Sequence, residues 1–181
     1  MASKKISPKL RARLARIKLF LCDVDGVLTD GSIFIGGERE IKRFNIRDGL
    51  GLVLARRAGL KIGWVSARPS EATKLRAEEL KIHFLVQQGD KTTKSVAVEN
   101  LLAAEKLTWE DVCFVGDDVV DIGPLSKAGV GVAVADARPE AIAAADLVTQ
   151  SDGGRGAVRE IVEMILQAQN KWEAAIAVYR E

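Results

Sequence analysis

The stretch LFLCDVDGVLTDG, residues 19–31, places an apolar run directly before two carboxylates, Asp23 and Asp25. A short apolar run bounded by a turn signal such as Gly26 is typical of a buried strand. In an open parallel sheet, ligands bind outside the carboxyl ends of the strands. The stretch therefore predicts a strand whose end opens into a functional site.

The rest of the chain alternates apolar runs of strand length with segments of helical periodicity, which is typical of βαβ units and a parallel sheet. Strands are expected at six apolar runs: 17–21, 61–65, 83–86, 112–115, 130–134 and a short one at 147–148. The first of these ranges includes the end of the basic N-terminal segment. Helices are expected between them: 49–58, 70–80, 91–105, 119–128 and 139–144. The fold class is thus α/β, a Rossmann-like open parallel sheet with helices on both faces.

Three segments depart from this alternation. Residues 32–44 have alternating character on both sides of Gly36-Gly37 and predict an inserted β-hairpin, too small to be a separate cap domain. Residues 1–16 predict a basic amphipathic helix, and residues 155–181 predict a C-terminal helix and tail whose late Trp172 and Tyr179 are available to cover another subunit. We expect one domain over 1–181.

Composition limits the function classes. The chain has 181 residues, 48% hydrophobic content and a formal net charge of +2, which suits one core and gives no argument for a nucleic-acid partner. We expect no membrane span or secretory signal, and a cytoplasmic protein. Cys22 and Cys113 each lie in an apolar run, so buried thiols are favoured over a disulfide.

Polar residues follow several of the predicted strands. Ser66, Ala67 and Arg68 follow the second, Lys91 comes later, and the fourth is followed by GDDVVD, residues 116–121. Separately, these residues have structural explanations as turn residues, helix caps or surface charge. Together they place several carboxylates at one sheet edge, and that concentration of negative charge predicts a hard, oxygen-seeking cation such as Mg²⁺.

The order of these motifs resembles the haloacid dehalogenase superfamily of phosphohydrolases, from residue 17 to about 169. More narrowly, CDVDGVLTDG, FNIRDGLGL, DKTTK, GDDVVDIGPL, VAVADA and GGRGAVREI resemble the capless 3-deoxy-D-manno-octulosonate 8-phosphate phosphatases. Relatives that act on nonulosonate 9-phosphates share much of this pattern. Two departures are visible: Ser66-Ala67-Arg68 stands where the family usually has Thr-Gly-Arg, and Gly123-Pro124 displaces a common proline by one position.

The resemblance implies roles for the residues that match. Asp23 would be the nucleophile that forms an aspartyl-phosphate, and Asp25 would be the general acid and base. Asp23, Asp117 and the backbone carbonyl of Asp25 would hold Mg²⁺. The phosphoryl group would be bound by Ser66, the amide of Ala67 and Lys91, with Asp118 and Asp121 orienting Lys91, the metal or its waters.

The substrate of such an enzyme carries a carboxylate besides its phosphate, and arginines suit that end. Arg47 and Arg68 are the candidates, and Arg155 is equally well explained as part of a glycine-rich helix entry. The resemblance also implies a homotetramer in which the hairpins gather centrally and a neighbouring subunit helps cover each site.

Two functions stay open from the sequence. The first is a Mg²⁺-dependent phosphatase acting on 3-deoxy-D-manno-octulosonate 8-phosphate in lipopolysaccharide precursor synthesis, or on a nonulosonate 9-phosphate. The second is a noncatalytic oligomerisation module, since similar domains occur fused to sugar-nucleotide cytidylyltransferases. The intact set of candidate catalytic residues favours the enzyme.

Overall fold

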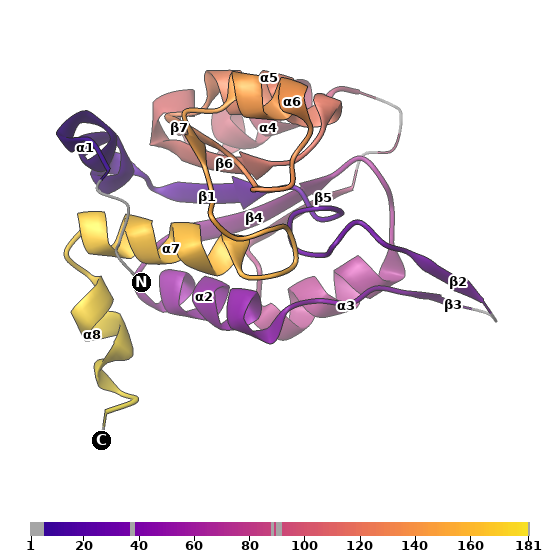
Figure 1. Ribbon diagram of the computed structural model, residues 1–181, viewed down its shortest axis with the longest axis horizontal. Helices are drawn as coiled ribbons and strands as arrows, with labels where there is room; N and C mark the ends of the chain where they lie inside the picture. The colour runs from indigo at the N-terminus through magenta and orange to yellow at the C-terminus, as the bar shows by residue number, and fades with distance from the viewer. Residues whose placement is uncertain (1–5, 37–38, 88, 90–91, 181) are drawn as a thin grey trace.

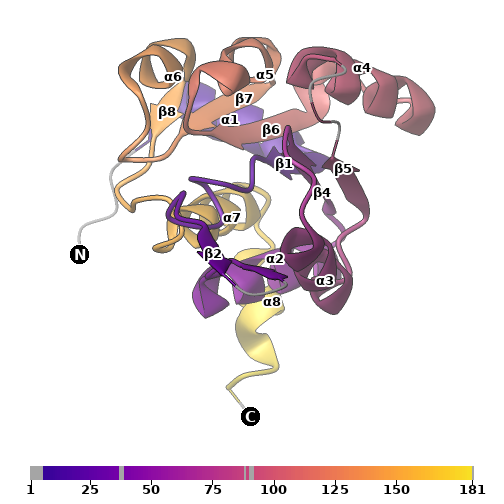
Figure 2. The same cartoon turned by 90° about the vertical axis from the view of Figure 1, so that its right-hand side faces the viewer.

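The protein is a six-stranded parallel sheet between two layers of helices, with a projecting two-stranded hairpin (Figures 1 and 2). The computed structural model describes residues 6–36, 39–87, 89 and 92–180. The strands lie in the order β5-β4-β1-β6-β7-β8. Their bounds are β1 Leu19–Cys22, β4 Lys61–Ser66, β5 Phe84–Gln87, β6 Val112–Gly116, β7 Val130–Ala133 and β8 Leu147–Val148. The predicted fold class and the last short strand are confirmed.

The strand order places β1 at the centre of the sheet, between β4 and β6. All four residues of β1 are buried, because helices cover both of its faces. Side chains alternate along it: Phe20 and Cys22 join the core on one face, and Leu19 and Leu21 join the core on the other. The first strand begins two residues later than residue 17, since Ile17 ends the N-terminal helix.

Two groups of helices cover the two faces of the sheet (Figure 2). The bounds on the first face are α1 Pro8–Arg16, α2 Ile46–Arg57, α3 Glu71–Leu80, α7 Ala157–Ala168 and α8 Trp172–Ala177; those on the second are α4 Lys94–Glu105, α5 Ile122–Lys127 and α6 Pro139–Ala144. Short 3₁₀ turns precede β6 at Trp109–Asp111 and α5 at Val119–Asp121. Of the described helices, none is long and apolar enough to cross a bilayer.

Helix starts differ from the sequence expectations where a polar cap decides them. The predicted helix 49–58 begins at Ile46, because the Asn45 side chain accepts hydrogen bonds from the amides of Arg47 and Asp48. The predicted helix 91–105 begins at Lys94, because Thr93 is its cap. The predicted helix 119–128 is a 3₁₀ turn followed by α5.

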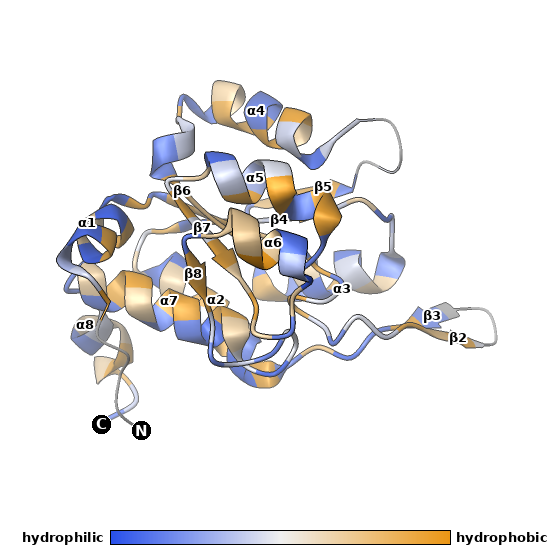
Figure 3. Cartoon of the chain, turned by 45° about the horizontal axis from the view of Figure 1, so that its top comes forward, coloured by the Kyte–Doolittle hydropathy of each residue, from blue (hydrophilic) through white to orange (hydrophobic). Residues whose placement is uncertain are grey.

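The predicted hairpin is present between β1 and α2, with β2 Phe34–Gly36 paired antiparallel to β3 Arg39–Ile41. Its turn at Gly37 lies outside the described residues. The hairpin projects from the body, and β2 is coloured as hydrophobic in Figure 3. Phe34, Ile35 and Ile41 are exposed by 56%, 90% and 62%. Phe34 and Ile41 are cross-strand partners, and such an exposed apolar pair is typical of an interaction site.

The C-terminal segment differs in one respect from its prediction. The apolar stripe of α7 is buried as expected, but Trp172 and Ile176 of α8 pack partly buried against the core of their own chain. The Arg159 guanidinium also lies over the Trp172 ring, with its Cζ atom 5.1 Å from the ring centroid. Tyr179 is the late aromatic that stays exposed.

Candidate active site

Strand β1 delivers Asp23 to the carboxyl edge of the sheet. The Asp23 amide continues the sheet pairing by donating to the Val115 carbonyl, 2.9 Å away, and the side chain accepts from the Val24 amide at 2.7 Å. Asp23 is only 6% exposed. The backbone then turns at Gly26, whose φ of +89° suits glycine. The Asp23 carboxylate is therefore held in a fixed, nearly dry position.

Strand β6, beside β1, delivers the second group of carboxylates. Asp121 is fully buried, and its Oδ2 accepts from the amide of Asp117 at 3.0 Å and from that of Asp118 at 3.4 Å. The Asp118 side chain caps the 3₁₀ turn by accepting from the Val119 amide at 2.7 Å. Asp118 and Asp121 thus shape the loop that presents Asp117.

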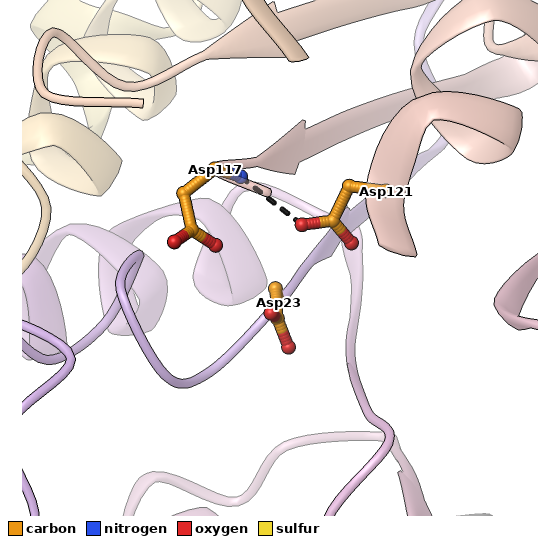
Figure 4. Close-up of side chains that lie close together, drawn as sticks. All are labelled: Asp23, Asp117 and Asp121. Carbon is orange, nitrogen blue, oxygen red and sulfur yellow. Dashed lines mark hydrogen bonds between the residues drawn. The ribbon is translucent and has the colours of Figure 1, made fainter. Parts of the chain in front are cut away.

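Asp23, Asp117 and Asp121 lie close together at the ends of β1 and β6 (Figure 4). One carboxylate oxygen from each lies within 4.8 Å of the others. The Asp117 Oδ1 atom is buried and has no hydrogen-bond partner in the described part of the chain. Gly26 closes over the same carboxylate, since a Cβ there would stand 2.0 Å from Asp117 Oδ2. These oxygens fit a hard divalent cation, which would complete the bonding of Asp117.

The electrostatics of the cluster agree with a cation site. Burial raises the pKa of Asp117 to about 8, and the neighbouring charges of Asp23 and Asp121 contribute in the same direction. Burial and Asp121 also raise the pKa of Asp23, against the opposing effect of Lys94. A bound cation would relieve both costs by neutralising the carboxylates.

The lysine that pairs with two carboxylates of the cluster is Lys94. Its ammonium lies 2.8 Å from Asp23 Oδ2 and 2.7 Å from Asp121 Oδ1, and the residue is 3% exposed. Lys91, the lysine expected from the sequence, lies outside the described residues. Thr93 is the sequence feature that could have indicated Lys94. As the cap of α4, it places Lys94 in the first turn of that helix, toward the sheet edge.

Ser66 ends β4 at the same edge of the sheet and is buried. Its hydroxyl accepts from the Arg68 amide at 3.1 Å and donates to the Arg68 carbonyl at 3.0 Å, so it closes a tight turn. Ala67 lies half-buried in that turn. The three predicted residues therefore stand beside the strand that carries Asp23.

The predicted arginines do not form one cluster. Arg68 forms an ion pair with Glu40 of β3, and Ser70 donates to the same carboxylate at 2.6 Å. Arg47 and Arg155 are exposed, on segments that a hydrogen bond from Asn45 Nδ2 to the Gly154 carbonyl joins at 3.3 Å. Arg68 is thus engaged within the chain, whereas Arg47 and Arg155 are open to a ligand.

Asp25 has a partner that sequence spacing did not indicate. The Lys42 ammonium lies 2.6 Å from Asp25 Oδ1 and 2.9 Å from Oδ2. Lys42 follows β3 of the hairpin, and nothing in its immediate sequence marks it apart from the other basic residues nearby.

The parallel sheet with carboxylates after β1 and β6, a hydroxyl after β4 and a lysine between the carboxylates defines a haloacid dehalogenase-like phosphohydrolase. The family model described as haloacid dehalogenase-like hydrolase matches residues 88–161. The chain is 39% identical over 171 residues to the 3-deoxy-D-manno-octulosonate 8-phosphate phosphatase of Salmonella typhimurium, covering 94% of this chain and 90% of that protein. It is 41% identical over 164 residues to that of Yersinia pestis, covering 90% and 87%.

Solved structures agree. The Moraxella catarrhalis 3-deoxy-D-manno-octulosonate 8-phosphate phosphatase, in complex with a magnesium ion, a phosphate ion and a KDO molecule, superposes with a TM-score of 0.92 at 35% identity, covering 96% of this chain and 99% of that one. The cobalt-bound form of the deoxy-D-mannose-octulosonate 8-phosphate phosphatase from Haemophilus influenzae superposes with a TM-score of 0.84 at 38% identity, covering 90% of this chain and 94% of that one. The chain belongs to the 3-deoxy-D-manno-octulosonate 8-phosphate phosphatase family.

Proposed function

We propose that this chain is a Mg²⁺-dependent phosphatase that converts 3-deoxy-D-manno-octulosonate 8-phosphate to 3-deoxy-D-manno-octulosonate and inorganic phosphate, in lipopolysaccharide precursor synthesis. The carrying observation is the buried Asp23 at the end of β1, beside Asp117 and in contact with Lys94. A buried carboxylate in a polarised site is a nucleophile suited to phosphoryl transfer. The identity to family members supports the substrate class.

In the first half of the proposed reaction, an Asp23 oxygen attacks phosphorus and the bond from phosphorus to the sugar oxygen breaks. Asp25, in its protonated form, gives its proton to that leaving oxygen. Bound Mg²⁺, held by Asp23, Asp117 and the Asp25 carbonyl, supplies positive charge that lets two anions approach. The products of this half-reaction are the free sugar acid and phosphorylated Asp23.

In the second half, water attacks the phosphorus of phosphorylated Asp23, and the Asp25 carboxylate takes the proton of that water. The bond from phosphorus to the Asp23 oxygen breaks, which releases inorganic phosphate and restores both carboxyl groups. Ser66, the Ala67 amide and Lys94 stabilise the transferring phosphoryl group. Lys94 takes the charge-offsetting role expected of Lys91, because its ammonium already contacts Asp23.

Recognition of the sugar acid needs cations beyond the phosphate site. Arg47 and Arg155 are exposed on adjoining segments and suit the carboxylate end of the substrate. Arg68 acts less directly, since Glu40 already occupies its guanidinium. We assign Arg47 and Arg155 to carboxylate binding and Arg68 to holding the hairpin against the turn at Ser66.

The active form is proposed to be a homotetramer in the cytoplasm. Exposed Phe34, Ile35 and Ile41 give the hairpin an apolar surface for association with other copies. The two cysteines are free and buried, which suits a reducing compartment.

The first test is phosphate release with Mg²⁺ from an octulosonate 8-phosphate, a nonulosonate 9-phosphate and a hexose phosphate. We expect a clear preference in kcat/KM for the octulosonate ester and no release after Mg²⁺ is removed by a chelator. A preference for the nonulosonate ester would reassign the substrate. No release from any of the three would favour the noncatalytic module.

A pair of lysine variants tests which lysine offsets the negative charge of the phosphoryl group. Lys94→Met should lower kcat by about 100-fold or more, because it removes the cation on the nucleophile. Lys91→Met is the matched comparison, and we expect less than about a threefold change. Asp23→Asn should abolish phosphate release. The reverse order of the two lysine effects would restore Lys91 to the catalytic role.

A further inference from the structure

Lys42 is a buried cation whose ammonium lies between the hairpin and the active site. Its side chain has no exposed surface. Besides both Asp25 oxygens, the ammonium contacts Thr73 Oγ1 of α3 at 3.2 Å, to which it donates, and lies 3.7 Å from Glu40 Oε1 of β3. An ammonium withdrawn from water is costly unless such partners surround it. Its position is therefore set by Asp25, Thr73 and Glu40 together.

The partners of Lys42 are themselves fixed. Thr73 is fully buried in α3, and Glu40 is held by Arg68 and by Ser70. A continuous set of polar contacts thus runs from the hairpin and α3 to Asp25. The Asp25 carboxylate, by contrast, is 24% exposed.

The hydrogen bond from the ammonium to Oδ2 and its ion pair with Oδ1 together restrict how the Asp25 side chain can rotate. A general acid must keep its proton within hydrogen-bond reach of the leaving oxygen, and an orientation error of about 1 Å can cost roughly 100-fold in rate. After Asp25 has given up its proton, the adjacent ammonium also offsets the new negative charge. Orientation and charge both serve the same proton transfer.

We propose that Lys42 is a positioning residue for Asp25, with Thr73 and Glu40 holding its ammonium in place. The inference rests on the proposed function, since it assigns a support to the acid of that reaction. It also gives the hairpin a second use: the segment that carries the exposed apolar surface supplies the residue that aligns Asp25. A purely structural explanation is that Lys42 only fastens the hairpin to the body, and the two explanations predict different kinetics.

The test compares Lys42→Met with wild type on two esters: the octulosonate 8-phosphate, whose leaving alkoxide needs a proton, and p-nitrophenyl phosphate, whose leaving group does not. We expect kcat on the sugar phosphate to fall about 100-fold with KM changed less than about threefold. The rapid initial release of nitrophenolate, which reports the first half-reaction, should fall less than about threefold. Arg43→Met is the matched control, because Arg43 adjoins Lys42 but pairs with Asp30 at the surface.

Two further variants keep the test informative if Lys42→Met folds poorly. Lys42→Arg should recover at least about tenfold of the lost kcat, because it retains the charge. Thr73→Val should lower kcat on the sugar phosphate by about fivefold and leave the initial release of nitrophenolate nearly unchanged, since it removes one bond to the ammonium. Mg²⁺ affinity, measured by calorimetry, should be unchanged in each folded variant.

An initial release of nitrophenolate that falls as much as kcat on the sugar phosphate, or a kcat on the sugar phosphate in Lys42→Met within about threefold of wild type, would overturn the positioning role while leaving the phosphatase assignment intact. Wild-type protein that releases no phosphate from the sugar ester would overturn the proposed function instead, and the inference with it.

Discussion

At the scale of single residues, the site is defined by side chains that would be unfavourable without a ligand. Asp117 shows this most clearly, because it is close to two other carboxylates and has a buried oxygen with no hydrogen-bond partner in the described chain. Its contribution to stability must therefore depend on pH and on metal. The sign of that dependence follows from its raised pKa.

The first prediction concerns Asp117 in the metal-free protein. Its folded-state pKa of about 8 exceeds the ordinary value near 4, so the folded chain binds this proton more tightly than the unfolded chain does. Stability should accordingly fall as pH rises through roughly 4 to 8. In a chelator, the Tm of wild type should drop between pH 5.5 and pH 8 more steeply than that of Asp117→Asn, measured by thermal unfolding.

Adding Mg²⁺ is the second arm of that measurement. It should raise the Tm of wild type most at pH 8 and leave Asp117→Asn nearly unchanged, because the variant lacks one carboxylate of the proposed metal site. Parallel pH profiles for the two proteins, or an equal Mg²⁺ shift in the variant, would remove Asp117 from the metal site.

At the scale of elements, one buried carboxylate joins two helices. Asp48 lies inside α2 and is 1% exposed. It accepts from the amides of Gly156 at 3.2 Å and Arg159 at 2.8 Å, at the start of α7. These bonds hold the glycine-rich loop and Arg155 against α2.

Asp48→Ala should therefore lower the free energy of unfolding by about 2 kcal/mol, because two amides lose their acceptor. Chemical denaturation measures this directly. Asp152→Ala is the control, since Asp152 is exposed in the same loop, and its effect should stay within about 0.5 kcal/mol. A similar loss in both variants would mean that the loop, rather than the Asp48 bonds, is sensitive to change.

At the scale of the whole molecule, the hairpin is the part of the fold least explained by the chain alone. Its apolar side chains face solvent, whereas the rest of the described chain packs its large apolar residues mainly on the two faces of the sheet. The proposed tetramer gives those side chains a partner surface. Because Lys42 of the same segment contacts Asp25, the proposed association surface and the proposed support for catalysis both belong to the hairpin.

Ile35→Asp tests that assembly, because it places a charge at the most exposed apolar position of the hairpin. We expect light scattering after size-exclusion chromatography to report a smaller species, with the Tm of the dissociated chain lowered. Ile142→Asp on α6 is the control and should keep the wild-type mass. A tetramer that persists in Ile35→Asp would place the interface elsewhere.

Much of this protein follows from its sequence. Apolar runs followed by turn residues predicted the parallel sheet, and the carboxyl ends of its neighbouring strands necessarily share an edge, so Asp23 and Asp117 could be placed together. Only the tertiary structure decided which long side chains reach them. Lys94 contacts Asp23 because α4 begins at the Thr93 cap, and Lys42 contacts Asp25 from the hairpin. Asp48 accepts a hydrogen bond from an amide at the start of α7. Those pairings depend on helix starts and on the separation of distant backbones, which residue spacing does not specify.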